Sequence, residues 1–149
     1  MKDRIIDVDG VNSFLILRSE ECNSEIDIAI TQKDVRELQN AKAAIAAGVK
    51  ILIKQAGINV NVIERVFLAG GFGSYINIES ALKIGLLPKE LTGKIESIGN
   101  AAGSGAVEGL LSAKMLGEAN VIKSRIKYVE LSGRPDFVEE YVECMMFEA

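Results

Sequence analysis

Glycines that follow a short apolar run are the residues of this sequence best suited to chemistry. The run is Val66-Phe-Leu-Ala, and Gly70, Gly71, Phe72 and Gly73 come directly after it. An unbroken apolar run of this length is typical of a central parallel strand buried on both faces. Bare backbone at the carboxyl end of such a strand lets a ligand approach the main chain closely. The pattern predicts a ligand-binding turn at residues 70–73, although a tight turn without a ligand fits it too.

Two familiar phosphate-binding glycine motifs do not match this turn. Reading from Gly71 gives G-x-G-x-x-Ile, and Ile76 stands where the dinucleotide fingerprint needs a small residue. No GxxxxGK[ST] loop occurs, and no acidic residue stands about 20 positions after a proper fingerprint. A Rossmann-type oxidoreductase is therefore disfavoured.

Composition excludes several other kinds of site. The chain has 149 residues, 48% of them hydrophobic, which suits one compact domain. Its net charge of -4 gives a nucleic-acid backbone no basic partner. Histidine is absent, which removes the commonest general base at neutral pH. The two cysteines, Cys22 and Cys144, stand far apart in the sequence, so we expect no metal site and no disulfide framework.

The sequence also shows neither the apolar run of a signal peptide nor that of a membrane span. Charges stand near the amino terminus where a signal peptide needs an apolar run, and glycines interrupt the longest uncharged stretch. We therefore expect a soluble, cytoplasmic protein.

The elements that would position the turn alternate along the chain. Residues 1–30 predict a β-hairpin, with Asp7-Val-Asp-Gly as a turn, and Thr31 predicts the cap of a helix that ends before Gly57. The apolar stripe of that helix contains Val35, Leu38, Ile45, Val49, Leu52 and Ala56. Strands are then expected at 66–69, 94–98 and 127–131, and helices at 78–84, 101–116 and from Asp136 onward. This alternation predicts an α/β fold in three layers, a mostly parallel sheet with flanking helices.

Two features allow both a functional and a structural interpretation. Lys42 interrupts the apolar stripe among small residues, either to meet a ligand or to extend its ammonium to water while its stem covers the sheet. The helix expected at 101–116 begins with Gly103, Gly105 and Gly109, which indicate close approach by a ligand or tight packing on the sheet.

Several segments together carry a family resemblance. They are Val66-Phe-Leu-Ala-Gly-Gly-Phe-Gly, the helix sequence 30–48, Ile84-Gly-Leu-Leu-Pro, the glycine-rich 99–106 and Tyr128-Val-Glu-Leu. Over residues 28–147 the chain resembles the carboxyl-terminal actin-like (ASKHA) ATPase domain of the reductive activators of corrinoid proteins. The resemblance implies part of an RNase H-like lobe: 1–30 as a hairpin from the lobe boundary, and 31–149 as a nucleotide-binding half-domain.

The resemblance also implies roles for particular residues. Gly70, Gly71, Phe72 and Gly73 match the adenosine motif, which lies against the adenine and ribose of ATP or ADP. Asn100 begins a segment similar to the next turn and helix start of this half-domain. Glu37 and Lys42 lie on a helix similar to the one that flanks the base and sugar.

Parts of the family pattern are missing from this chain. The superfamily binds phosphates and Mg²⁺ between two lobes through two Asp-containing hairpins, and neither hairpin is found here. Full-length relatives use ATP to return cob(II)alamin to cob(I) in corrinoid proteins, and they carry a [2Fe-2S] ferredoxin domain that this sequence lacks. We therefore expect a fragment of an iron–sulfur ATP-dependent activase that is inactive alone. The alternative is a non-catalytic interaction or dimerisation module that docks a partner or a second copy through residues 137–146.

Overall fold

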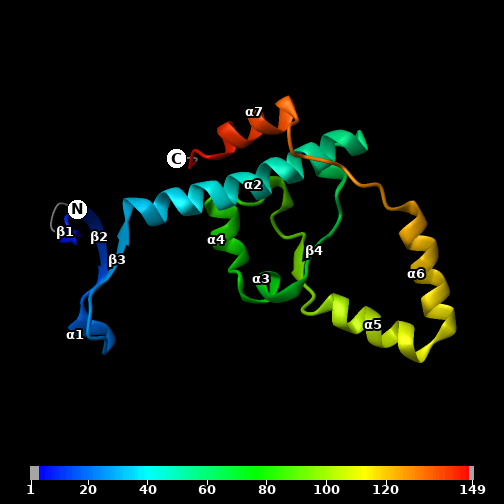
Figure 1. Ribbon diagram of the computed structural model, residues 1–149, viewed down its shortest axis with the longest axis horizontal. Helices are drawn as coiled ribbons and strands as arrows, with labels where there is room; N and C mark the ends of the chain where they lie inside the picture. Colours follow the sequence, from blue (N-terminus) through cyan, green and yellow to red (C-terminus); the bar gives the residue numbers. More distant parts are fainter. Residues whose placement is uncertain (1–3, 148–149) are drawn as a thin grey trace.

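Helices flank two small sheets in a mixed α/β fold (Figure 1). The computed structural model describes residues 4–147, so residues 1–3 of the predicted hairpin and 148–149 of the predicted half-domain lie outside the described residues. The α/β class with flanking helices is confirmed. Among the described helices, none combines the length and apolar character needed to cross a membrane.

The first sheet is an antiparallel meander at the amino-terminal end of the chain. Its strands are β1 (Ile5–Val8), β2 (Val11–Leu17) and β3 (Ile28–Thr31), in that order. The predicted hairpin therefore gains a third strand. Asp9 and Gly10 turn the chain with φ of 53° and 80°, and Asp7 Oδ1 accepts a hydrogen bond from the Gly10 amide at 2.9 Å, which confirms the predicted turn.

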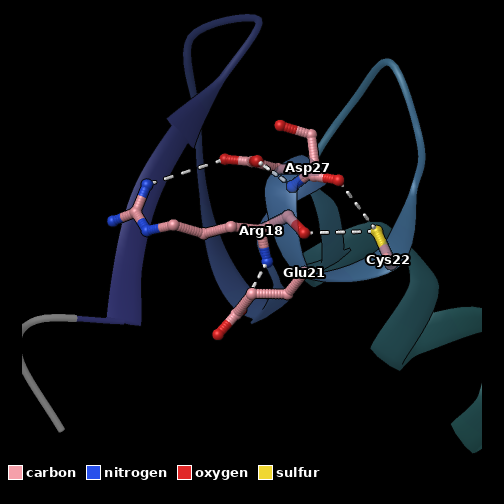
Figure 2. Close-up of polar contacts among 5 residues, drawn as sticks. Arg18, Glu21, Cys22 and Asp27 are labelled. Atoms are coloured by element: carbon pink, nitrogen blue, oxygen red, sulfur yellow. Dashed lines mark hydrogen bonds and ion pairs between the residues drawn. The ribbon is translucent and has the colours of Figure 1, made fainter.

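A polar cluster closes the connection between β2 and β3, which contains the short helix α1 (Ser19–Cys22) (Figure 2). The Arg18 amide donates to Glu21 Oε2 at 3.0 Å, and the Arg18 guanidinium lies 3.9 Å from Asp27 Oδ2. Cys22 Sγ donates to the Arg18 carbonyl at 3.2 Å. These local bonds hold the part-exposed Cys22 at the end of α1, far along the sequence from Cys144.

The long helix α2 (Gln32–Ala56) begins and ends where the sequence predicts. Thr31 Oγ1 accepts from the Asp34 amide at 3.1 Å, Asp34 Oδ2 accepts from the Thr31 amide at 2.9 Å, and Gly57 stops the helix with φ of 65°.

The apolar stripe of α2 is not its buried face. The large side chains of the apolar stripe, including Val35, Leu38, Ile45 and Leu52, are exposed. The buried residues are Lys42, Ala43, Ala46, Ala47, Gly48 and Ile51. Helix α7 (Pro135–Cys144) packs on this small-residue face, because small side chains let two helix backbones approach closely.

The second sheet leads into the predicted glycine segment, which begins a helix where the sequence predicts a turn. Strands β4 (Val66–Leu68) and β5 (Ile95–Ser97) pair in parallel, with Leu68 opposite Ser97. Within residues 4–147 β4 has β5 as its one partner and Phe67 is exposed, so the prediction of a central strand buried on both faces is wrong. Helices α3 (Gly70–Tyr75) and α4 (Ile78–Lys83) follow β4, and the short turns η2 (Val60–Val62) and η3 (Lys89–Leu91) lie nearby. The buried cluster of Ala81, Leu86 and Leu87 packs against Leu68 and Ile95.

The carboxyl-terminal third departs most from the predicted elements. Two helices, α5 (Ala101–Leu111) and α6 (Ala113–Arg125), replace the single helix 101–116, because Ser112 leaves the helical conformation and its Oγ accepts from the Met115 amide at 3.3 Å. Residues 126–134 form no strand. Helix α7 begins at Pro135, and Asp136 lies in its first turn instead of at the cap.

Candidate functional site

Two turns meet at the carboxyl ends of β4 and β5. The Ile98 amide donates to the Leu68 carbonyl at 2.9 Å, and the Gly70 amide donates to the Gly99 carbonyl at 2.7 Å. Because the strands are parallel, Gly70–Gly73 and Asn100 therefore leave the same edge of the sheet. The structure thus brings together two predicted site segments, Gly70–Gly73 and Asn100, that are separated in the sequence.

The glycines of the first turn differ in what the fold requires of them. Gly70 has φ of 79°, a conformation that other residues rarely adopt. A Cβ on Gly73 would lie 2.7 Å from the Leu68 backbone carbon, so close packing excludes a side chain there. Gly71 has neither constraint: its φ is not left-handed, and a Cβ would meet nothing within 4 Å. The fold therefore explains Gly70 and Gly73 and leaves Gly71 without a structural reason.

Aromatic side chains flank Gly71 at an open hollow on α3. Gly71, Phe72, Tyr75 and Ile76 line this hollow, and Phe72 and Tyr75 are 61% and 91% exposed. Exposed aromatic faces are suited to stacking on a planar base, and no charged residue lines the hollow. The sequence prediction included Phe72 but missed Tyr75, which one helical turn places beside it.

Asn100 has a local structural role at the second turn. Its Oδ1 accepts a hydrogen bond from the Gly103 amide at 3.0 Å and caps α5. A Cβ on Gly103 would lie 2.5 Å from Asn100 Nδ2, so this glycine makes room for the cap. A Cβ on Gly105 would meet nothing within 4 Å, so tight packing on a sheet does not account for it.

Lys42 and Glu37 lie on α2, apart from the two turns. Lys42 is 2% exposed, and its Nζ donates to the carbonyls of Cys144 and Met146, each at 2.6 Å. The interpretation that its ammonium reaches water is therefore wrong. A nucleotide contact through Lys42 remains a prediction and would require these bonds to be exchanged. Glu37 is exposed on the same helix.

The polar contacts between α2 and α7 could not be predicted from the sequence. Lys50 Nζ contacts Glu140 Oε2 at 2.9 Å, which raises the pKa of Lys50, and Lys54 Nζ lies 3.9 Å from Asp136 Oδ2. Two hydrogen bonds from Arg134 lower the pKa of the Asp136 carboxyl to about 2, and nearby Lys54 adds to the effect.

The packing of α7 bears on the docking alternative. Tyr141, Cys144 and Met145 pack against Ala43 and Ala46 of α2. This part of the apolar face of α7 is therefore occupied within the chain.

The structure is an α/β domain, and its candidate ligand-binding edge lies at the carboxyl ends of the parallel strands β4 and β5. A model of the family described as the C-terminal domain of RACo, the ASKHA domain, matches residues 1–149. The chain therefore belongs to this family, and the resemblance seen in the sequence is confirmed.

Individual relatives agree with the family. The corrinoid activation enzyme RamQ of Eubacterium limosum is 43% identical over 148 residues, covering 99% of this chain and 25% of the relative. A reductase of the Co(II) methylated amine-specific corrinoid protein from Methanosarcina barkeri is 33% identical over 99 residues, covering 66% of this chain and 18% of the relative.

A solved structure also has this fold. It is a reductive activator for a corrinoid, iron-sulfur protein, with a TM-score of 0.79 and 36% identity, over 97% of this chain and 23% of that chain. This chain spans about a quarter or less of the length of these three relatives.

Proposed function

We propose that this chain is the half-domain of an ATP-dependent reductive activator of corrinoid proteins that holds the adenosine part of ATP. The adenine and ribose lie against the main chain at Gly71, beside the aromatic rings of Phe72 and Tyr75. The corrinoid protein is the partner of the full-length activator.

The open space at Gly71 is the observation that carries this proposal. A glycine that the fold does not require, at the carboxyl edge of parallel strands and beside two exposed rings, leaves room for a ligand against its backbone. The identity to corrinoid activators supports the parent activity.

The chain's own residues bind and orient, and they do not supply the redox chemistry. Cys22 and Cys144 lie on α1 and α7, so the described thiols do not fit a [2Fe-2S] site. No charged side chain lines the hollow at Gly71, so the phosphates and Mg²⁺ belong to groups outside it. When bound in the full-length protein, a [2Fe-2S] cluster supplies the electrons for cobalt reduction.

Calorimetric titration of the full-length natural protein with ADP tests the site. Gly71→Val fills the open space, and we expect it to weaken binding at least tenfold. Tyr75→Ala removes a stacking surface, which is worth about 1–3 kcal/mol per base in stacked complexes. Gly117→Val on α6 is the matched control, since a Cβ there also meets nothing within 4 Å.

The expected pattern is loss at Gly71 and Tyr75 with unchanged affinity at Gly117. Wild-type affinity in Gly71→Val would remove the adenosine assignment while leaving the family membership intact.

A further inference from the structure

Helix α7 is attached to the rest of the domain through α2, in a close helix contact that combines a few apolar side chains with several polar bonds. Its one buried residue is Cys144, which forms a cluster with Ala43 and Ala46 of α2. Val138 and Val142 of α7 are exposed. A segment that buries little apolar surface is held with a low local stability and can open without global unfolding.

Links between α2 and α7 run along α7, and the buried ones lie at its carboxyl-terminal end. The buried Lys42 Nζ binds the carbonyls of Cys144 and Met146, and Gln39 Nε2 donates to the intervening Met145 carbonyl at 3.1 Å. The Phe147 ring centroid lies 5.0 Å from Nζ. Side chains of α2 thus bind three consecutive carbonyls at the end of a helix, where the helix dipole favours a cation.

This arrangement makes docking reversible. A buried ammonium held by carbonyls loses its hydration on docking, and both partners regain water when they separate. The net contribution of the contact is therefore smaller than its short distances suggest. The same contact is specific, because it needs a side chain long enough to reach both carbonyls and able to donate to each of them.

The connection to α7 permits such a movement. Residues 126–134 link α6 to α7 without regular secondary structure, so separation of α7 breaks no strand pairing among the described residues (Figure 1).

Helix α7 also forms one wall of a cavity of about 640 Å³. It contributes Glu140, Glu143 and Cys144, α2 contributes Lys42, Lys50 and Lys54, and residues 58–60 and 87–90 form the remaining sides. The volume lies within the range of small-molecule pockets, about 300–1,000 Å³. Separation of α7 would remove one wall of this cavity and expose the wall formed by α2.

We propose that α7 and residues 145–147 form a latch that opens independently of the rest of the domain, and that Lys42 is the residue that keeps it closed. Opening exposes the small-residue face of α2 and the cavity beneath α7. The proposal does not depend on nucleotide binding at Gly71.

The two cysteines provide the test. Cys144, on the latch itself, is 9% exposed where it packs against α2, and the part-exposed Cys22 on α1 serves as an internal reference. N-ethylmaleimide labelling of each cysteine in the wild-type chain is followed by mass spectrometry across low urea concentrations. A latch predicts that Cys144 labelling changes little with urea, because local opening exposes little surface. Labelling that rises as steeply as global unfolding would overturn the proposal.

The second arm removes the Lys42 contact. Lys42→Met retains most of the side-chain volume, and we expect at least a tenfold increase in the Cys144 labelling rate with an unchanged Cys22 rate. Lys33→Met, an exposed lysine in the first turn of the same helix, is the matched control and should change neither rate. An unchanged Cys144 rate in Lys42→Met, or an equal increase at both cysteines, would contradict the role of Lys42. If Lys42→Met does not fold, the wild-type urea series still decides whether the latch exists.

Discussion

Two pairs of helices in this molecule differ in how much of their contact surface is buried. Helices α2 and α7 are far apart in sequence, yet they share a buried cluster and side-chain bonds along their length. Helices α5 and α6 are adjacent in sequence and contact each other, but neither has a buried residue. Leu110 and Leu111, at the end of α5, are among the most exposed apolar residues described.

The difference shows that apolar content alone does not decide which helix face is buried. Helix α5 is the more apolar in sequence, while α2 buries alanines, a glycine and a lysine. A narrow, small-residue face allows a second helix to approach, and polar side chains then fix its position. Val107, Leu110 and Leu111 of α5 are exposed even though α5 contacts α6.

Truncation of one large side chain in each pair gives the largest expected contrast. Ile51 of α2 is 0% exposed, whereas Leu110 of α5 is 86% exposed. We expect Ile51→Ala to lower the free energy of unfolding by about 3 kcal/mol, because it leaves a cavity. Leu110→Ala should change it by less than about 0.5 kcal/mol, since the side chain already meets solvent. Urea unfolding followed by circular dichroism measures both, and equal losses would contradict the comparison.

Glycine substitutions should change stability in opposite directions in the two pairs. Gly105→Ala on α5 adds a methyl group in open space within a helix, so we expect stabilisation of about 0.5–1 kcal/mol. Gly57→Ala after α2 must adopt φ of 65° and should destabilise by about 1 kcal/mol. Thermal melts of the two variants check the signs. Destabilisation by Gly105→Ala would indicate a neighbour that the open space does not show.

The smallest effect should be a pH-dependent one at the start of α7. The folded-state pKa of Asp136 is lowered to about 2 from 3.8, so its contribution is present above about pH 4 and disappears as pH falls toward 2. Asp136→Asn should therefore have a slightly lower Tm than wild type at pH 6 and an equal Tm near pH 2. Glu139→Gln, an exposed carboxylate on the same helix, is the control. An equal Tm difference at both pH values would show that the charge is not responsible.

Much of the local structure followed from short-range chemistry. The cap at Thr31, the stop at Gly57 and the turn at Asp9–Gly10 depend on neighbouring residues, and each is found where predicted. The strand predicted at 127–131 is absent because a segment of this kind forms a strand only where a partner strand exists, and none pairs with it in the described chain. The predicted helix 101–116 was wrong because Ser112, which caps α6, was read as an interior residue.

The candidate site was predicted only in part. The paired turns at Gly70 and Gly99 follow from parallel strands, whose carboxyl ends share an edge. Tyr75 was missed because its exposure beside Phe72 depends on a helix that starts at Gly70, where the sequence indicated a turn.

The sequence by itself determined the elements with local signals, the family and the parallel strand that ends in glycines. These depend on residues within a few positions of one another or on shared motifs. Tertiary structure decided which face of α2 is buried and where the Lys42 ammonium lies. Both depend on α7, about 100 positions away along the chain, because the carbonyls at 144 and 146 reach Lys42 only after the two helices have packed.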